Sequence, residues 1–167
     1  MKGIAIEIKW AFIFVLVTLA WMAFERAIGL HGAYIDKHAV YTNLYAIPAI
    51  AVYVFALLDK RKNYYNGTMS YKQGFISGLI ITGIVTLLVP LTQYITSSVV
   101  APGYFSNVIS HVVEEDKMTL EEAQNYFNLR NYIIQGLVSS PVMGIITTAV
   151  VSFFTSAKKK KSEEFTS

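Results

Sequence analysis

The sequence of 167 residues contains no cysteine, which excludes disulfides, thiolate metal sites and cysteine nucleophiles. Charged residues are also scarce: they make up 15% of the chain, whereas soluble domains carry about 25%. Hydrophobic residues reach 54%, and the 14% of aromatic residues excludes an intrinsically disordered chain. The shortage of charge and the apolar excess together indicate a membrane protein.

Four long stretches of the chain lack charged residues or nearly so. A helix needs about 20 mainly apolar residues to cross the hydrocarbon core of a bilayer. We therefore predict an all-α, polytopic membrane protein whose single domain covers residues 1–157. Its four transmembrane helices are expected at about residues 6–28, 40–59, 74–100 and 131–157.

The first apolar stretch has an alternative interpretation. Lys2 and Lys9, followed by Thr18-Leu19-Ala20, resemble the basic start and the small-residue cleavage site of a signal peptide. Cleavage there would leave three spans and place Trp21 at the new N-terminus. We expect a retained helix.

The distribution of Lys and Arg predicts the orientation of the chain. Ten of these residues fall at the N-terminus, in the loop after the second span and in the tail of residues 158–167, whereas four fall on the opposite side. Cytoplasmic loops carry the excess of Lys and Arg, so both termini are expected to be cytoplasmic. The run Lys158–Lys161 suits an anionic lipid surface. We expect the lipid bilayer as a partner, and no nucleic acid.

Residues 101–130 are predicted to form an extracytoplasmic helical hairpin between the third and fourth spans. Apolar residues recur in this segment at helical spacing, and Thr119 and Glu122 have the spacing of a capping box. The break between the two helices is expected near Asp116-Lys117. The segment either caps the bundle or binds a partner.

Small residues at a spacing of four mark two helix-packing faces. In lipid, helices associate through close contact between small residues. The third and fourth spans are therefore expected to meet, within the chain or between copies, through these positions: Gly74, Gly78, Thr82, Gly136, Ser140 and Gly144.

The sequence contains few candidates for catalytic or ligand-binding residues. Phosphate-binding, dinucleotide-binding and hydrolase motifs are absent from the sequence, so we expect neither catalytic residues nor a cofactor, and no enzyme activity. The best candidate for a polar site lies on the outer side. Its members are Glu25, His31, His38 and His111. Because these residues lack a spacing such as HxxxH, and because a sequence cannot show ligands converging, we expect no metal site.

The order of several short segments resembles a bacterial family of small four-helix membrane proteins, catalogued as domain of unknown function 4199. These segments are Gly29-Leu30-His31, Leu57-Leu58-Asp59-Lys60-Arg61, residues 66–75, Pro102-Gly103-Tyr104-Phe105 and residues 118–123. The resemblance covers nearly the whole chain. It implies a bacterial inner-membrane location and four spans, but no catalytic or binding residues.

Two functions remain open from the sequence. The first is a structural or accessory role in the inner membrane, through lipid contacts and through a homo-oligomer or a membrane-protein partner. The second is a small transporter or channel component. Small multidrug exporters depend on a carboxylate deep within a span, whereas Glu25 lies at a span end. We therefore favour the accessory role.

Overall fold

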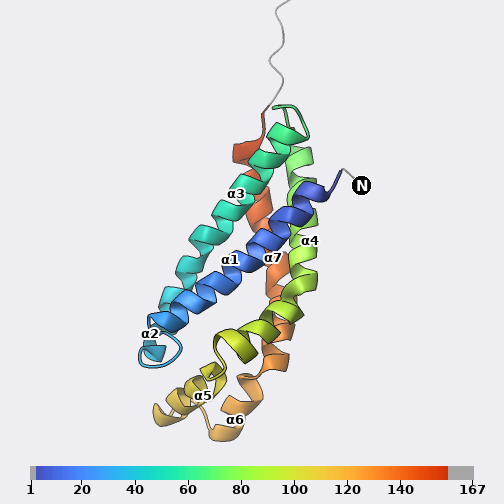
Figure 1. Ribbon diagram of the computed structural model, residues 1–167. Coiled ribbons are helices and arrows are strands. Elements are labelled where there is room, and N and C mark those ends of the chain that lie inside the picture. Colours follow the sequence, from blue (N-terminus) through green and yellow to red (C-terminus); the bar gives the residue numbers. More distant parts are fainter. Residues whose placement is uncertain (1–2, 158–167) are drawn as a thin grey trace, which may run out of the picture.

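Four long helices form an up-and-down bundle in the computed structural model, which describes residues 3–157 (Figure 1). The long helices are α1 (Ala5–Ala27), α3 (Ala46–Asn63), α4 (Tyr71–Ile95) and α7 (Leu129–Thr155). The short ones are α2 (Ile35–Tyr41), the 3-10 turn η1 (Thr42–Tyr45), the π-helical turn η2 (Thr96–Val100), α5 (Tyr104–Glu114) and α6 (Leu120–Tyr126). Residues 3–157 contain no strand, and the predicted all-α class is confirmed.

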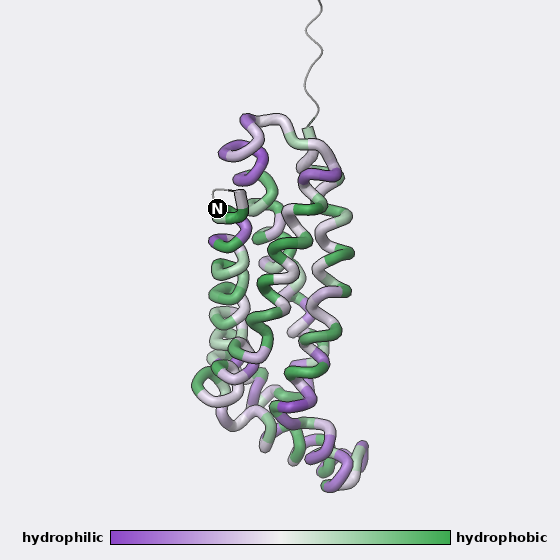
Figure 2. Tube along the Cα trace, turned by 90° about the vertical axis from the view of Figure 1, so that its right-hand side faces the viewer, coloured by the Kyte–Doolittle hydropathy of each residue, from purple (hydrophilic) through white to green (hydrophobic). Residues whose placement is uncertain are grey.

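Four segments are long and apolar enough to cross a membrane: Ala5–Ala27, Ile35–Asn63, Tyr71–Val100 and Leu129–Thr155. The second begins at residue 35 rather than at about 40, because α2 and η1 run directly into α3. Hydrophobic residues fill the middle of the long helices, and hydrophilic residues gather towards both ends of the bundle (Figure 2). Large apolar side chains face outwards, such as Leu87 and Phe154, which are 80% and 77% exposed. Such a surface is suited to hydrocarbon rather than to water.

Helices α4 and α7 touch through small residues on both partners. A Cβ atom at Gly78 would lie 2.4 Å from Cγ2 of Thr148, and one at Gly144 would lie 2.3 Å from Cγ2 of Thr82. The two contacts are reciprocal, because each helix offers a glycine to a threonine of the other. Any larger residue at either glycine would force the two backbones apart.

The same register extends along the α4–α7 interface. The hydroxyls of Thr86 and Ser140 lie 3.1 Å apart, and a Cβ atom at Gly74 would lie 3.3 Å from Oγ of Ser152. Each step of four residues forward along α4 is therefore matched by a step of four residues backward along α7. This pattern is that of two antiparallel helices in contact over most of their length.

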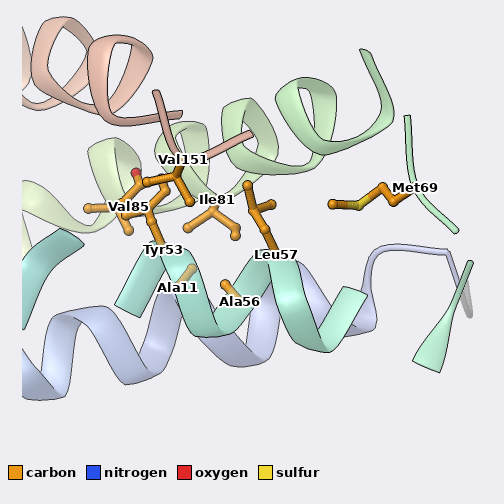
Figure 3. Close-up of a cluster of buried hydrophobic side chains, with 8 residues drawn as sticks. All are labelled: Ala11, Tyr53, Ala56, Leu57, Met69, Ile81, Val85 and Val151. Carbon is orange, nitrogen blue, oxygen red and sulfur yellow. The ribbon is translucent and has the colours of Figure 1, made fainter. Parts of the chain in front are cut away.

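A compact apolar cluster joins α1 and α3 to the α4–α7 pair (Figure 3). The hydroxyl of Tyr53 reaches across it and lies 2.8 Å from Oγ1 of Thr82, so its polar atom is satisfied inside the bundle. The cluster draws on all four long helices and on the loop before α4; its members are Ala11, Tyr53, Ala56, Leu57, Met69, Ile81, Val85 and Val151.

The α3–α4 loop lies against the end of α7, at the end of the bundle where α1 begins, here called the termini end (Figure 1). The backbones of Met69 and Ala157 pair through two hydrogen bonds of 3.0 and 2.8 Å. Asn66 and Gly67 both have positive φ, 51° and 86°, and form a turn, as the dipeptide Asn-Gly commonly does. The guanidinium of Arg61 donates to the carbonyl of Thr155 at 2.9 Å and so satisfies the C-terminal turn of α7.

Helices α5 and α6 lie at the opposite end of the bundle, here called the α5 end (Figure 1). Thr119 and Glu122 form the expected capping box, in which each side chain bonds the other's backbone amide. The amide and hydroxyl of Thr119 hold the pKa of Glu122 below its usual value. The break between the helices falls at residues 115–119, where Asp116 has a φ of 52°. Two short helices, α5 and α6, thus lie between α4 and α7.

Substitution of Gly78 by Val is expected to destabilise the bundle by about 1–3 kcal/mol, because the new side chain overlaps Thr148 at the α4–α7 contact. The measurement is reversible unfolding in mixed detergent micelles. Gly83, in the same helix, has open space around it, so Gly83→Val is the matched control. Combining Gly78→Ala with Thr148→Ala should restore part of the stability that Gly78→Ala removes. Equal losses of unfolding free energy for Gly78→Val and Gly83→Val would contradict this account of the interface.

Candidate functional site

A carboxylate is buried at the α5 end of α1. Glu25 lies in the last turns of this helix, and none of its surface is exposed. Trp21, one turn earlier, donates from Nε1 to Oε1 of Glu25 at 2.6 Å. The i, i+4 spacing of the two residues makes this bond possible within a single helix. One carboxylate oxygen is thus held by α1 itself, and Oε2 faces other elements.

Two histidines converge on that second oxygen. Nε2 of His31 lies 3.2 Å from Oε2 of Glu25, and Nε2 of His38 lies 3.4 Å from it. His31 follows α1 in a tight turn in which Gly29 has a φ of 86°, a conformation that favours glycine. This turn brings His31 back over the end of α1, and α2 then places His38 beside it. The three residues Glu25, His31 and His38 are called the Glu–His–His cluster below.

Helix α5 covers the Glu–His–His cluster. The ring of Tyr104 packs against both imidazoles, with centroid separations of 5.1 Å to His31 and 5.2 Å to His38. The side chain of Asn107, one turn further along α5, donates to the backbone carbonyl of His31 at 2.7 Å. Burial raises the pKa of Tyr104, and Tyr132 and Glu25 raise it further, so the phenol stays protonated. Its hydroxyl lies 3.2 Å from that of Tyr132, which links α5 to α7.

A cavity of about 250 Å³ adjoins the cluster. His31 forms part of its wall, together with Arg26, Tyr104 and Asn107. Nδ1 of His31 is buried and has no hydrogen-bond partner among residues 3–157. Buried polar atoms in proteins nearly always have a partner. This atom is an exception among residues 3–157, as are the hydroxyls of Thr148 and Ser152.

The fourth residue of the predicted polar site lies elsewhere. His111, near the end of α5, has its Nε2 3.5 Å from Oε2 of Glu115 in the next turn. The ammonium of Lys117 bonds the same carboxylate and lowers the pKa of Glu115. The structure thus brings Glu25, His31 and His38 together and places His111 in a separate group with Glu115 and Lys117.

A second buried polar group lies at the termini end, and sequence reasoning missed it. Glu7 and Lys60 are 1% and 3% exposed, and Nζ of Lys60 lies 2.8 Å from Oε1 of Glu7. The hydroxyl of Ser77 also donates to Glu7. The signal was present in the spacing, because Lys60 continues the buried face of Tyr53, Ala56 and Leu57 in α3. This group ties α1, α3 and α4 together.

An uncharged cavity of about 400 Å³ opens inside the bundle, between η1 and the four long helices. Hydroxyl groups form much of its polar lining, and Thr18 and Tyr45 bond one another across 2.5 Å at its edge. Gly136, Ser140 and Gly144, expected as helix-packing residues, also line it. A Cβ atom at Gly136 would lie 2.7 Å from Cγ1 of Val89, so this glycine both faces α4 and borders the cavity.

Four apolar helices of membrane-spanning length, exposed apolar side chains around them and polar groups at both ends are the features of a multi-pass helical membrane protein. Residues 9–156 match the family model described as "Protein of unknown function (DUF4199)", and the chain belongs to this family. No curated protein and no solved structure matches the chain.

Replacing Lys60 by Met is expected to cost about 3 kcal/mol, because it leaves the Glu7 carboxylate buried without its cation. Adding Glu7→Gln to that variant should recover part of the loss. Lys62→Met is the matched control, since Lys62 lies exposed in the same helix. Unfolding of the four proteins in mixed micelles gives the comparison. Indistinguishable Lys60→Met and Lys62→Met variants would refute a stabilising Glu7–Lys60 pair.

Proposed function

We propose that this chain is a multi-pass protein of the bacterial inner membrane, with both termini in the cytoplasm. Charge at the two ends of the bundle supports this orientation. Basic residues gather at the termini end, among them Lys60, Arg61, Lys62 and Lys72. The segment that holds α5 and α6 is acidic, with Glu114, Glu115, Asp116, Glu121 and Glu122. The positive-inside rule then makes α5 and α6 an extracytoplasmic helical hairpin. The tail of residues 158–167, which adds basic residues to the same side, lies outside the described residues.

Within that membrane we infer an accessory or structural role, exerted through contacts with lipid or with other membrane proteins, rather than catalysis. The observation that carries this inference is the location of the buried charges. Glu7 and Lys60 pair at one end of the bundle, and Glu25 lies among His31 and His38 at the other. Between these two ends the buried residues are apolar or carry hydroxyls. A charge-driven transport path would need an ionisable group in this middle region.

The absence of cysteine makes the proposed orientation directly testable. A cysteine introduced at Gln124, exposed in α6, is expected to react with a membrane-impermeant maleimide in intact cells. A cysteine at Asn66, exposed in the α3–α4 turn, should react only after the membrane is opened. The unsubstituted chain gives the background. The reverse labelling pattern would overturn the orientation.

A small transporter or channel component is the alternative, and the 400 Å³ cavity is the observation that favours it. Ser139 lies at the edge of this cavity on the exposed side of α7, so the cavity reaches the surface of the bundle. A solute path through the bundle would have to pass this region. The accessory role requires no such path.

Vesicles that contain the purified chain separate the two functions. The accessory role predicts no flux of monovalent ions or of small cationic dyes above that of empty vesicles. Transport would appear as flux that Ser139→Trp reduces by filling the cavity. Val138→Trp is the matched control, because Val138 is 63% exposed and is not part of the cavity wall. Flux that responds to Ser139→Trp alone would replace the accessory role with the alternative.

A further inference from the structure

We propose that Glu25, His31 and His38 bind one divalent transition-metal ion, and that their geometry suits Zn²⁺. This inference concerns the α5 end of the bundle, and it does not depend on whether the protein is an accessory protein or a transporter. It revises the expectation of no metal site, which rested on sequence spacing alone.

The donor set fits such an ion. Imidazole nitrogen and carboxylate oxygen are ligands that Zn²⁺ binds at about 2.0–2.2 Å, and four such ligands in a tetrahedron lie about 3.3 Å from one another. In the Glu–His–His cluster, the carboxylate oxygen lies 3.2 Å from one imidazole nitrogen and 3.4 Å from the other. All three ligand atoms lie within 4.8 Å of one another. Two edges of a ligand tetrahedron, those from the carboxylate oxygen to each imidazole nitrogen, are thus already formed.

The surroundings hold the ligands in place. Trp21 occupies Oε1 of Glu25, so the carboxylate presents a single oxygen, Oε2, to an ion. Tyr104 packs against both imidazoles, and Asn107 holds the backbone of His31. Partners of this kind, which fix the orientation of metal ligands, typically change metal affinity by 10–100-fold when removed. The cluster therefore has the orienting contacts of a metal site as well as its donors.

The burial of the cluster also favours a cation. Glu25 is fully buried and His31 is 6% exposed, so the carboxylate is shielded from water. Arg26, the adjacent basic residue, lines the cavity but donates to the carbonyl of Val100 rather than to Glu25. A buried carboxylate requires a compensating charge or strong hydrogen bonds. A divalent ion at Oε2 would supply that charge at the point where the two imidazoles converge.

The cavity beside His31 provides access and a further ligand position. Its volume of about 250 Å³ holds several water molecules. A Zn²⁺ ion with three protein ligands keeps a fourth position for water or another small ligand.

The test is Zn²⁺ titration of the full chain, purified in mild detergent through a tag without histidine and stripped with a chelator. Calorimetry is expected to give one Zn²⁺ per chain. His38→Ala and Glu25→Gln should each weaken binding by at least about 10–100-fold. His111→Ala is the matched control and should bind as the unsubstituted chain does, because His111 lies outside the cluster. Mg²⁺ should not compete, since it selects oxygen ligands.

Thermal unfolding in detergent gives a second readout that does not depend on the heat of binding. Zn²⁺ should raise the midpoint of the unsubstituted chain and of His111→Ala, because a ligand of the folded state stabilises it, and should leave His38→Ala unmoved. If circular dichroism shows that His38→Ala has lost its helical structure, His38→Gln is used in its place. The proposal is overturned if the folded chain shows no saturable Zn²⁺ binding, or if the His38 variants bind as tightly as His111→Ala.

Discussion

The close approach of α4 and α7 is the constraint on which the rest of the bundle depends. In hydrocarbon the hydrophobic effect does not drive helices together, so their association depends on close packing. The glycines at 78 and 144 let each helix accept a threonine of the other, and Thr82 also receives a hydrogen bond from Tyr53 of α3. Helix α3 is thus fixed against the α4–α7 pair, and α1 contacts both α3 and α4, where Ser77 donates to Glu7.

A different kind of interaction joins the other two long helices, α1 and α3. Helices α1 and α3 carry the buried ion pair between Glu7 and Lys60, and the indole of Trp10 donates to Asp59 at 2.6 Å nearby. Near the α5 end, Thr18 and Tyr45 are joined by their hydroxyls. The bundle therefore consists of two hairpins: α1–α3, held by polar groups at its ends, and α4–α7, held by small residues along its length. Neither pair places charge in the middle of a span. The buried hydroxyls of Thr148 and Ser152 on α7 have no hydrogen-bond partner among residues 3–157.

Sequence reasoning could predict the parts of this fold that depend on local sequence patterns. The length of the apolar stretches indicated the long helices, and Thr119 and Glu122 indicated the start of α6. The candidate site could be predicted only in part, because convergence depends on a turn angle and on tertiary contact. The positive φ of Gly29 brings His31 back to Glu25, and nothing in the residue spacing separates His38, which joins them, from His111, which does not. The contact of Tyr104 with the two histidines could not be predicted for the same reason, since Tyr104 lies in α5, far along the chain from the cluster.

The division into two hairpins has a consequence for biosynthesis. The partners of the two α1 carboxylates come from the chain up to Lys60, apart from the hydroxyl of Ser77, and the Glu–His–His cluster is complete at residue 38. Chains enter the membrane from the N-terminus as they are made. The first two spans can therefore supply partners for both carboxylates before α4 leaves the ribosome. Among the charged side chains of α1, Arg26 finds its partner later, at the carbonyl of Val100. Helices α4 and α7 bring few charges of their own, and they can join afterwards by packing alone.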